Sequence, residues 1–147
     1  MDALKNDWID NPVTRWLASP RQVDDYLEFF NPLWRRSERR ARVLAVKHHN
    51  ADVVSLTLEP GRGWQQGFAG QHVMLGVDIG GVRHERCFSL SSTLAGQAPE
   101  ITVKRNGQGL VSNHLVDAVK PGELVWLGDA GGDFVLPWPR PACLLFI

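Results

Sequence analysis

The sequence has no excess of charge of either sign and no long apolar run. Lysine plus arginine and aspartate plus glutamate both number 16, so the formal net charge is zero. A protein that binds nucleic acid needs a positive field to displace counterions, and this balance argues against such a partner. No apolar run is long enough to span a bilayer, and the N-terminus has no charged-then-apolar leader. We expect a cytoplasmic protein without a transmembrane segment.

Cysteine is scarce, and no metal-binding pattern accompanies it. The 147 residues include two cysteines, Cys87 and Cys143, far apart in sequence. Two thiols cannot hold an iron–sulfur cluster that needs four thiolates, and they do not form an extracellular disulfide scaffold. His72, His84 and His114 are expected at strand or helix edges. We therefore expect no metal bound by this chain itself.

The composition is that of one globular domain whose larger part is built of strands. Hydrophobic residues make up 44% and charged residues 22%, which is ordinary for a soluble domain. From residue 41 onward the apolar residues recur with a period of two between turn residues, as at Gly80-Gly81. This pattern predicts six strands: ARVLAV (41–46), DVVSLTLEP (52–60), GQHVMLGVDI (70–79), VRHERCFSL (82–90), EITVKR (100–105) and LVWLG (124–128). A small antiparallel barrel is the expected fold, and a β-sandwich is the alternative.

One helix is expected between the last two strands, within NGQGLVSNHLVDAVKPGE (106–123). Pro121 and Gly122 are expected to end it. Gly107 and Gly109 stand just ahead of it, where glycine lets the backbone approach a ligand and the first-turn N–H groups make an anion site. The alternative is a plain loop-to-helix junction. Four apolar residues are expected on the buried face: Val111, Leu115, Ala118 and Val119.

The first forty residues follow a helical pattern instead. Apolar residues at helical spacing predict one amphipathic helix over 21–30: Val23, Tyr26, Leu27 and Phe30. We expect residues 1–37 to form a helical extension packed on the domain that follows. The alternative is a docking or membrane-surface element anchored by Trp16 and Trp34.

The last residues, LPWPRPACLLFI (136–147), combine three prolines with a continuous apolar run. A fully apolar strand needs cover on both faces, as in a parallel α/β sheet, and no other segment supplies one. We therefore expect residues 38–136 to form the barrel, and 137–147 to be a linker and the first strand of an absent domain. Trp126 and Trp138 are expected in core and linker packing.

The segment RHERCFSLSS (83–92) places cationic, aromatic and hydroxyl side chains within one predicted strand. Arg86 has a fork of donors suited to phosphate, and Phe88, two residues on, shares its side of the strand. Ser89 projects to the other side, and further hydroxyls follow. A ligand that is part phosphate and part planar heteroaromatic would use these groups together, and a flavin nucleotide is such a ligand.

These residues also have a purely structural interpretation. Arg86 could form a surface ion pair with Glu85 or Glu100. Cys87 and Phe88 could be ordinary barrel residues, and for Cys87 this is the interpretation we favour because nothing indicates a reactive thiol.

The segment RCFSLSS resembles the R-x-[YF]-S-[LT]-[ST] flavin motif of the ferredoxin–NADP reductase superfamily. Three further segments resemble motifs of that family in the family's order, over about 40–147. They are similar to the Gly-Gln strand, to the strand, loop and helix start that hold the flavin diphosphate, and to the barrel-closing turn: GFAGQHVMLGV (67–77), ITVKRNGQGLVSNHL (101–115) and GDAGGDFVLP (128–137).

The resemblance implies a six-stranded antiparallel Greek-key flavin-binding barrel with one inserted helix. A nicotinamide-binding α/β domain would follow it, and the glycine-rich turn of that domain would lie beyond residue 147. The chain looks closest to reductases with a C-terminal plant-type ferredoxin domain, some of which serve fatty-acid desaturases.

The resemblance also implies a role for each matching residue. Arg86 would pair with the flavin diphosphate, and Phe88 would lie against the isoalloxazine or the ribityl chain. Ser89 would be the catalytic residue, near N5 and O4 of the ring. Cys87, Leu90 and Ser91, neighbours on the same strand, would also bind the cofactor. Val103, Lys104 and Arg105 would line the ribityl and diphosphate with backbone groups. Gly109, Leu110, Val111 and Ser112 would hold the phosphates at the helix start.

Phe88 departs from the family pattern, which more often has tyrosine at this position. Stacking on the cofactor survives this change, whereas a hydroxyl hydrogen bond to its sugar chain does not. We expect FAD, with FMN as the alternative.

The function implied is that of an NAD(P)H-dependent, ferredoxin reductase-like flavoprotein. Hydride would pass from NAD(P)H to flavin N5, and electrons would leave singly to an iron–sulfur acceptor. That acceptor would be a ferredoxin or a fused domain with a two-iron two-sulfur cluster, with a desaturase as a downstream partner. Two other classes stay open, a non-redox ligand-binding barrel and a protein-interaction module built on the Trp-rich N-terminal region.

Overall fold

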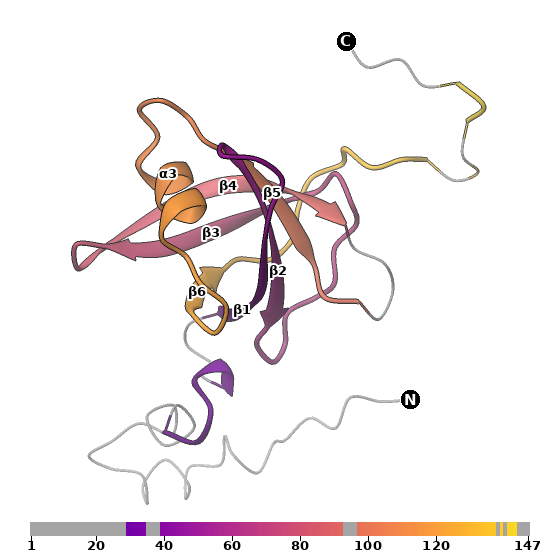
Figure 1. Cartoon of the computed structure of the whole chain (residues 1–147). Coiled ribbons are helices and arrows are strands. Elements are labelled where there is room, and N and C mark those ends of the chain that lie inside the picture. Colours follow the sequence, from indigo (N-terminus) through magenta and orange to yellow (C-terminus); the bar gives the residue numbers. More distant parts are fainter. Residues whose placement is uncertain (1–28, 35–38, 93–96, 138, 140, 144–147) are drawn as a thin grey trace, which may run out of the picture.

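The computed structural model describes residues 29–34, 39–92, 97–137, 139 and 141–143. Within these ranges the chain forms a closed barrel of strands with one short helix beside it (Figure 1). All six predicted strands are present, and their ends differ by at most two residues from those predicted. The elements are η1 (Pro32–Trp34), β1 (Arg40–His48), β2 (Val53–Pro60), β3 (His72–Ile79), β4 (Val82–Ser92), β5 (Glu100–Lys104), α3 (Leu110–Asp117) and β6 (Leu124–Leu127).

The strand order around the barrel is β1-β2-β5-β4-β3-β6, and every neighbouring pair is antiparallel. Strands β3, β4 and β5 form a meander, and β6 returns to lie beside β3, which is the Greek-key arrangement. Gly80 and Gly81 connect β3 to β4 with φ angles of +61° and +80°, as a two-residue hairpin requires. The predicted antiparallel Greek-key barrel is therefore confirmed, and the β-sandwich is wrong.

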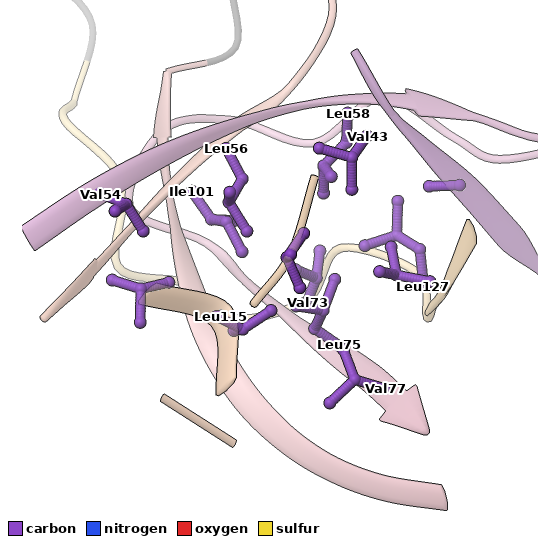
Figure 2. Packing of buried hydrophobic residues seen from close by; sticks show 14 of the residues in the cluster. Val43, Val54, Leu56, Leu58, Val73, Leu75, Val77, Ile101, Leu115 and Leu127 are labelled. Carbon is purple, nitrogen blue, oxygen red and sulfur yellow. The ribbon is translucent and has the colours of Figure 1, made fainter. Parts of the chain in front are cut away.

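The core lies inside the barrel and is built by every second residue of the strands (Figure 2). Val54, Leu56 and Leu58 of β2 are fully buried on its inner face, as the alternation predicts. Ser55 faces the outside of the barrel yet is 3% exposed. Its hydroxyl lies 2.9 Å from Thr102 Oγ1 and 2.8 Å from His49 Nε2, so burial leaves it hydrogen-bonded.

The helix expected between β5 and β6 is present, but it is shorter than predicted. It ends at Asp117, so Ala118 is the C-cap residue and is exposed. Val116, and not Ala118 as expected, is buried. Ala118 is excluded from the buried face because its φ of −115° already departs from the helix. Gly122 has φ +94° and belongs to the turn before β6, so Pro121-Gly122 does not end the helix.

Trp126 corrects another expectation, because it is half-buried on the outer face of the barrel and not in the core. Its β6 neighbours Val125 and Leu127 point inward instead. The guanidinium of Arg83 lies 3.8 Å from the Trp126 ring centroid and that of Arg40 lies 5.8 Å away. Cation–π contacts of this kind hold an indole at a surface.

Several expectations fall on other parts of the chain. Residues 21–28 of the predicted helix lie outside the described residues, and Phe29 and Phe30, its last two residues, are helical. Most of segments 1–37 and 137–147 also lies outside the described residues, as do Trp16 and Trp138. Within the described ranges, no helix has the length and apolar content needed to cross a membrane.

Candidate functional site

The register of β4 against β3 determines which way the predicted site residues point. Arg86 pairs with Leu75 and Phe88 pairs with Val73. Directly opposed residues of an antiparallel pair project to the same face, and both Leu75 and Val73 point into the barrel. Arg86 and Phe88 therefore share the inner face of β4, as expected from their spacing.

Phe88 and Arg86 differ in burial although they share this face. Phe88 is half-buried and packs against the core cluster. Arg86 is exposed, and its Nη1 donates to the main-chain carbonyl of Glu85 at 2.7 Å. Among the described residues, Arg86 forms no ion pair. The alternative of a salt bridge to Glu85 or Glu100 is therefore wrong. The guanidinium keeps donors for a ligand.

Ser89 and Cys87 lie on the opposite, outer face of β4. Ser89 is exposed and pairs with His72, whose backbone also bridges Gly131 with two hydrogen bonds of 2.9 Å. Cys87 is exposed opposite Met74. It is thus a surface residue of the barrel wall and not part of its core.

Beyond Ser89 the strand becomes irregular. Leu90 is 2% exposed and belongs to the core, and the register shifts between Leu90 and Ser92. The Ser91 hydroxyl donates to the Glu100 carbonyl at 3.1 Å and lies 3.1 Å from Thr102 Oγ1. Ser91 is therefore engaged with β5, and a bulge of this kind re-aims side chains at the end of a strand.

The start of α3 has the features of an anion site. Gly109 is the N-cap, and no side chain caps the helix. The N–H groups of Leu110, Val111 and Ser112 have no partners inside the helix, as in any first turn. The Ser112 hydroxyl donates back to the Gly109 carbonyl at 3.2 Å.

Glycine is needed at position 109 because the turn is tightly packed. A Cβ there would overlap the Ser112 hydroxyl and lie 2.9 Å from Asn106 Cβ. Gly107, by contrast, faces open space. The approach to the helix start is thus unobstructed on the side of Gly107.

A hollow of about 450 Å³ lies along this helix, with Gly107, Gly109 and His114 among the residues that line it. The side-chain carbonyl of Asn113, also in the lining, is buried and has no hydrogen-bond partner within the described part of the chain. An orphaned acceptor of this kind is costly in a folded protein. His72, His84 and His114 do not belong to a metal-binding cluster among the described residues.

The predicted site residues at the end of β5 differ in burial and in hydrogen bonding. Val103 is 1% exposed and belongs to the core, and Lys104 is exposed at the end of the strand. The backbone N–H of Arg105 donates to the Asp52 carbonyl at 2.7 Å. The Arg105 guanidinium contacts Asp52 and Asp117. It therefore meets α3 at the last residue of the helix, at the opposite end from Gly109.

Arg105 and Asp117 each stabilise the charged form of the other. Hydrogen bonding to Arg105 lowers the pKa of Asp117, and the same bond raises the pKa of Arg105. Asp52 and Asp117 were missed in the sequence. Asp117 could have been noticed because it falls in the last turn of the helix. The helix dipole disfavours a negative charge there unless a cation is near, so a cationic partner could have been expected.

The structure brings the two predicted cofactor segments next to each other. Helix α3 contacts β2, β4 and β5 (Figure 1). Leu115 of α3 belongs to the same core cluster as Val73 and Leu75, the residues opposite Phe88 and Arg86 (Figure 2). Arg86 and α3 therefore lie on the same face of the β3–β4 hairpin. Arg105 stands apart, with its side chain bound to the far end of the helix.

Comparison with known proteins gives close relatives for most of the chain, although no family model matches it. An NADPH oxidoreductase of Mycobacterium tuberculosis is 38% identical over 136 residues, which are 89% of this chain and 36% of that protein. A flavohemoprotein of Pseudomonas aeruginosa is 38% identical over 103 residues, 69% of this chain and 26% of that protein. The chain thus spans about a third or less of the length of these relatives.

Solved structures share the fold. The flavohem-like FAD/NAD-binding domain of a Vibrio cholerae nitric oxide dioxygenase matches with a TM-score of 0.60 and 34% identity, covering 67% of this chain and 45% of that one. A ferredoxin–NADP⁺ reductase of Neisseria gonorrhoeae, solved with FAD and NADP, matches at 0.57 and 21% identity, covering 65% and 39%. The motifs, the closed barrel with helix α3 beside it and these likenesses confirm the predicted resemblance: the chain carries the barrel of the ferredoxin–NADP reductase superfamily.

Proposed function

We propose that this barrel binds FAD and is the flavin-binding part of an NAD(P)H-dependent oxidoreductase. The observation that carries the proposal is the placement of an exposed Arg86 guanidinium and an uncapped helix start on one face of the β3–β4 hairpin. One segment supplies a cation and the other supplies backbone N–H groups. A diphosphate is the ligand that two such donors suit together.

The residues fit the phosphate end of FAD. Arg86 has unused donors, and Gly107 leaves the helix start accessible. The N–H groups of Leu110, Val111 and Ser112 would donate to phosphate oxygens. Lys104, exposed at the end of β5, adds a second cation. Together these groups would neutralise the diphosphate.

Two further residues of the predicted set enter the proposal through their backbone. Val103 is buried, so its side chain supports the site from the core, and Arg105 would contribute main-chain atoms because its guanidinium is bound to two aspartates. Gly109 would serve by allowing the close turn that precedes the helix.

The residues of β4 would hold the ring end. Phe88 would present its exposed part to the isoalloxazine or ribityl chain, and Ser89 would orient the ring by hydrogen bonding near N5 and O4. Cys87 and Leu90 would contribute backbone, with Leu90 anchored in the core. The Ser91 hydroxyl, bonded to β5, would hold the strand end in place.

Bound FAD would supply the redox chemistry, the acceptance of hydride and the release of single electrons. The protein would bind, orient and shield it, and no side chain need act as a strong acid or base. FAD is favoured over FMN because the helix start and Arg86 together suit a diphosphate, and because similar structures were solved with FAD.

The electron donor proposed is NAD(P)H, supported by the name of the M. tuberculosis relative. For the acceptor we keep the iron–sulfur protein, a ferredoxin or fused ferredoxin domain, as the first candidate. Relatives named flavohemoproteins and a flavohemoglobin structure with haem favour a haem acceptor as the second candidate. The closer similarity to reductases with a C-terminal ferredoxin domain, and a desaturase downstream, stay predictions.

The test is cofactor uptake by the purified chain. We expect a yellow protein with the absorbance bands of a bound flavin, and FAD as the nucleotide released on denaturation. A non-redox barrel would purify colourless and take up no added FAD. An interaction module would lose partner binding without residues 1–37, whereas flavin uptake would persist if the barrel is the functional unit.

Arg86→Ala should raise the Kd for FAD roughly 10- to 100-fold, the cost of a lost charge-assisted hydrogen bond. Arg42→Ala is the matched control, because Arg42 lies on β1, paired with Glu59. Arg86→Ala protein that is folded and binds FAD with unchanged affinity would contradict the site.

A further inference from the structure

We propose that Arg105 is a positioning residue that holds helix α3 in place through Asp117, and that its guanidinium does not bind the cofactor phosphates. This inference rests on the proposed function. Arg105 follows the strand that leads into the anion site, and a basic residue there suggests a phosphate ligand. The contacts of its side chain indicate a different role.

Every nitrogen of the Arg105 side chain already has an acceptor. Nη1 donates to Asp117 Oδ2 at 2.7 Å, and Nη2 donates to Asp117 Oδ1. Nε donates to Asp52 Oδ1 at 3.1 Å, and Nη2 also reaches the Ala51 carbonyl at 3.5 Å. A phosphate could reach this guanidinium only by displacing a bidentate carboxylate, which is the most favourable arrangement available to arginine.

These contacts join three separate segments. Ala51 and Asp52 belong to the turn between β1 and β2, Arg105 directly follows β5, and Asp117 ends α3. The backbone N–H of Arg105 is bound to the Asp52 carbonyl at 2.7 Å as well. The guanidinium is therefore fixed to the barrel on one side and to the helix on the other.

Helix α3 needs such a tie more than most helices do. It has eight residues and no side-chain cap at its start, and helices of this length are not stable without tertiary contacts. Asp117 is a negative charge in its last turn, where the helix dipole opposes it. Arg105 offsets that charge, and each group shifts the pKa of the other in favour of its charged form.

The tie governs the helix start because the helix moves as one body. Leu115 is fully buried and Val111, in the first turn, is 2% exposed, so the core holds one face of the helix from its first turn onward. Without the bond at Asp117 only this buried face holds the helix, so the helix can shift on the barrel, and such a shift displaces the N–H groups of its first turn. An isolated exposed ion pair would have little effect, but this pair is bidentate and shared with Asp52.

Asp117→Asn separates this role from direct phosphate binding, because the two predict opposite signs. If Arg105 bound phosphate, removing Asp117 would release the guanidinium and delete a nearby negative charge, so FAD would bind more tightly. If Arg105 acts through Asp117, the Kd for FAD should rise about three- to tenfold, within the range for residues that affect a ligand without touching it. Riboflavin, which lacks phosphate, should bind the variant as it binds the wild type.

The experiment titrates the full 147-residue chain with FAD and with riboflavin, following the quenching of flavin fluorescence, on protein shown to be folded by circular dichroism. Glu59→Gln is the matched control, because it removes another half-exposed carboxylate paired with an arginine, and neither affinity should change. Arg105→Ala in the Asp117→Asn background should add no further loss. Asp52→Asn, which leaves the Asp117 pair in place, should have a smaller effect and serves if Asp117→Asn does not fold.

Three results would overturn the inference while leaving the proposed function intact. They are FAD affinity that is unchanged or higher in Asp117→Asn, equal losses for FAD and riboflavin, and a further loss when Arg105→Ala is added to Asp117→Asn. A wild-type chain that takes up no FAD would overturn the proposed function, and the inference with it.

Discussion

Gln71 and Gly132, which are 61 residues apart in sequence, are joined by a hydrogen bond of 2.9 Å from the Gln71 side-chain amide to the Gly132 carbonyl. The side-chain oxygen of the same glutamine accepts a bond of 2.8 Å from the backbone N–H of Phe68. Gln71 thus ties the loop before β3 to the turn after β6, next to His72 and its β4 partner Ser89.

Replacing Gln71 with alanine removes both bonds of this tie. We expect Gln71→Ala to lower the free energy of unfolding by about 1–3 kcal/mol, since each net hydrogen bond contributes about 0.5–1.5 kcal/mol. Urea denaturation followed by circular dichroism measures the change. Gln65→Ala, at an exposed position on the same loop, is the control and should change stability by less than about 0.5 kcal/mol. Equal stabilities for the two variants would contradict the role of Gln71.

Gly70 and Gly63 offer a second matched comparison. Both have positive φ, +96° and +82°, so alanine at either site costs about 1–2 kcal/mol of backbone strain. A Cβ at Gly63 meets nothing within 4 Å, whereas a Cβ at Gly70 would overlap the Phe134 carbonyl. Gly70→Ala should therefore be destabilised by about 1–3 kcal/mol more than Gly63→Ala, the usual cost of overpacking.

Thermal and urea unfolding of these two glycine variants measure the difference directly. Backbone atoms of Phe134 cannot move aside as the end of a flexible side chain can. Gly70→Ala protein that is as stable as Gly63→Ala would show that the turn after β6 shifts freely, contrary to its hydrogen bonds with Gln71 and His72.

The Arg105–Asp117 pair predicts how stability depends on pH. Hydrogen bonding to Arg105 lowers the pKa of Asp117 in the folded state below its ordinary value of 3.8. The unfolded chain then binds the proton more readily, so the contribution is fully present above about pH 4–5 and is lost as the pH falls through the folded value. The stability difference between wild type and Asp117→Asn should be largest near pH 7 and should shrink at about pH 3.

Urea unfolding of both proteins at the two pH values measures this difference. Because the pair is partly exposed, 1 M salt should also reduce the difference at pH 7 by screening. A difference of the same size at pH 7 and pH 3 would show that Asp117 acts by packing and not by its charge.

Much of the fold could be predicted from local patterns. Val54, Leu56 and Leu58 alternate with polar residues, and each is fully buried, because a strand presents every second side chain to the core. The Gly80-Gly81 turn was likewise readable, since few residue pairs accept two successive positive φ angles. The relative placement of Arg86 and Phe88 on one face followed from the same period of two.

Other predictions failed where residues outside the segment determine which side chains are buried or where a helix ends. Trp126 is apolar enough for a core, yet Arg83 and Arg40 hold it on the outer face. Ala118 fits the helical period, but the helix ends at Asp117 before reaching it. Ser55 lies on the outer face of β2, and its burial there depends on Thr102 and His49, which come from neighbouring segments.

By itself, the sequence determined the strands, the hairpin glycines and the family motifs, because period, backbone freedom and residue order are properties of short segments. Only the tertiary structure decided the partner of Arg105. Asp52 is 53 residues away and Asp117 is 12 away, and they meet the guanidinium because barrel closure places the β1–β2 turn, the end of β5 and the end of α3 together. Electrostatic pairing acts over a few ångströms of space, and no local pattern encodes which charges a closed barrel will bring within that range.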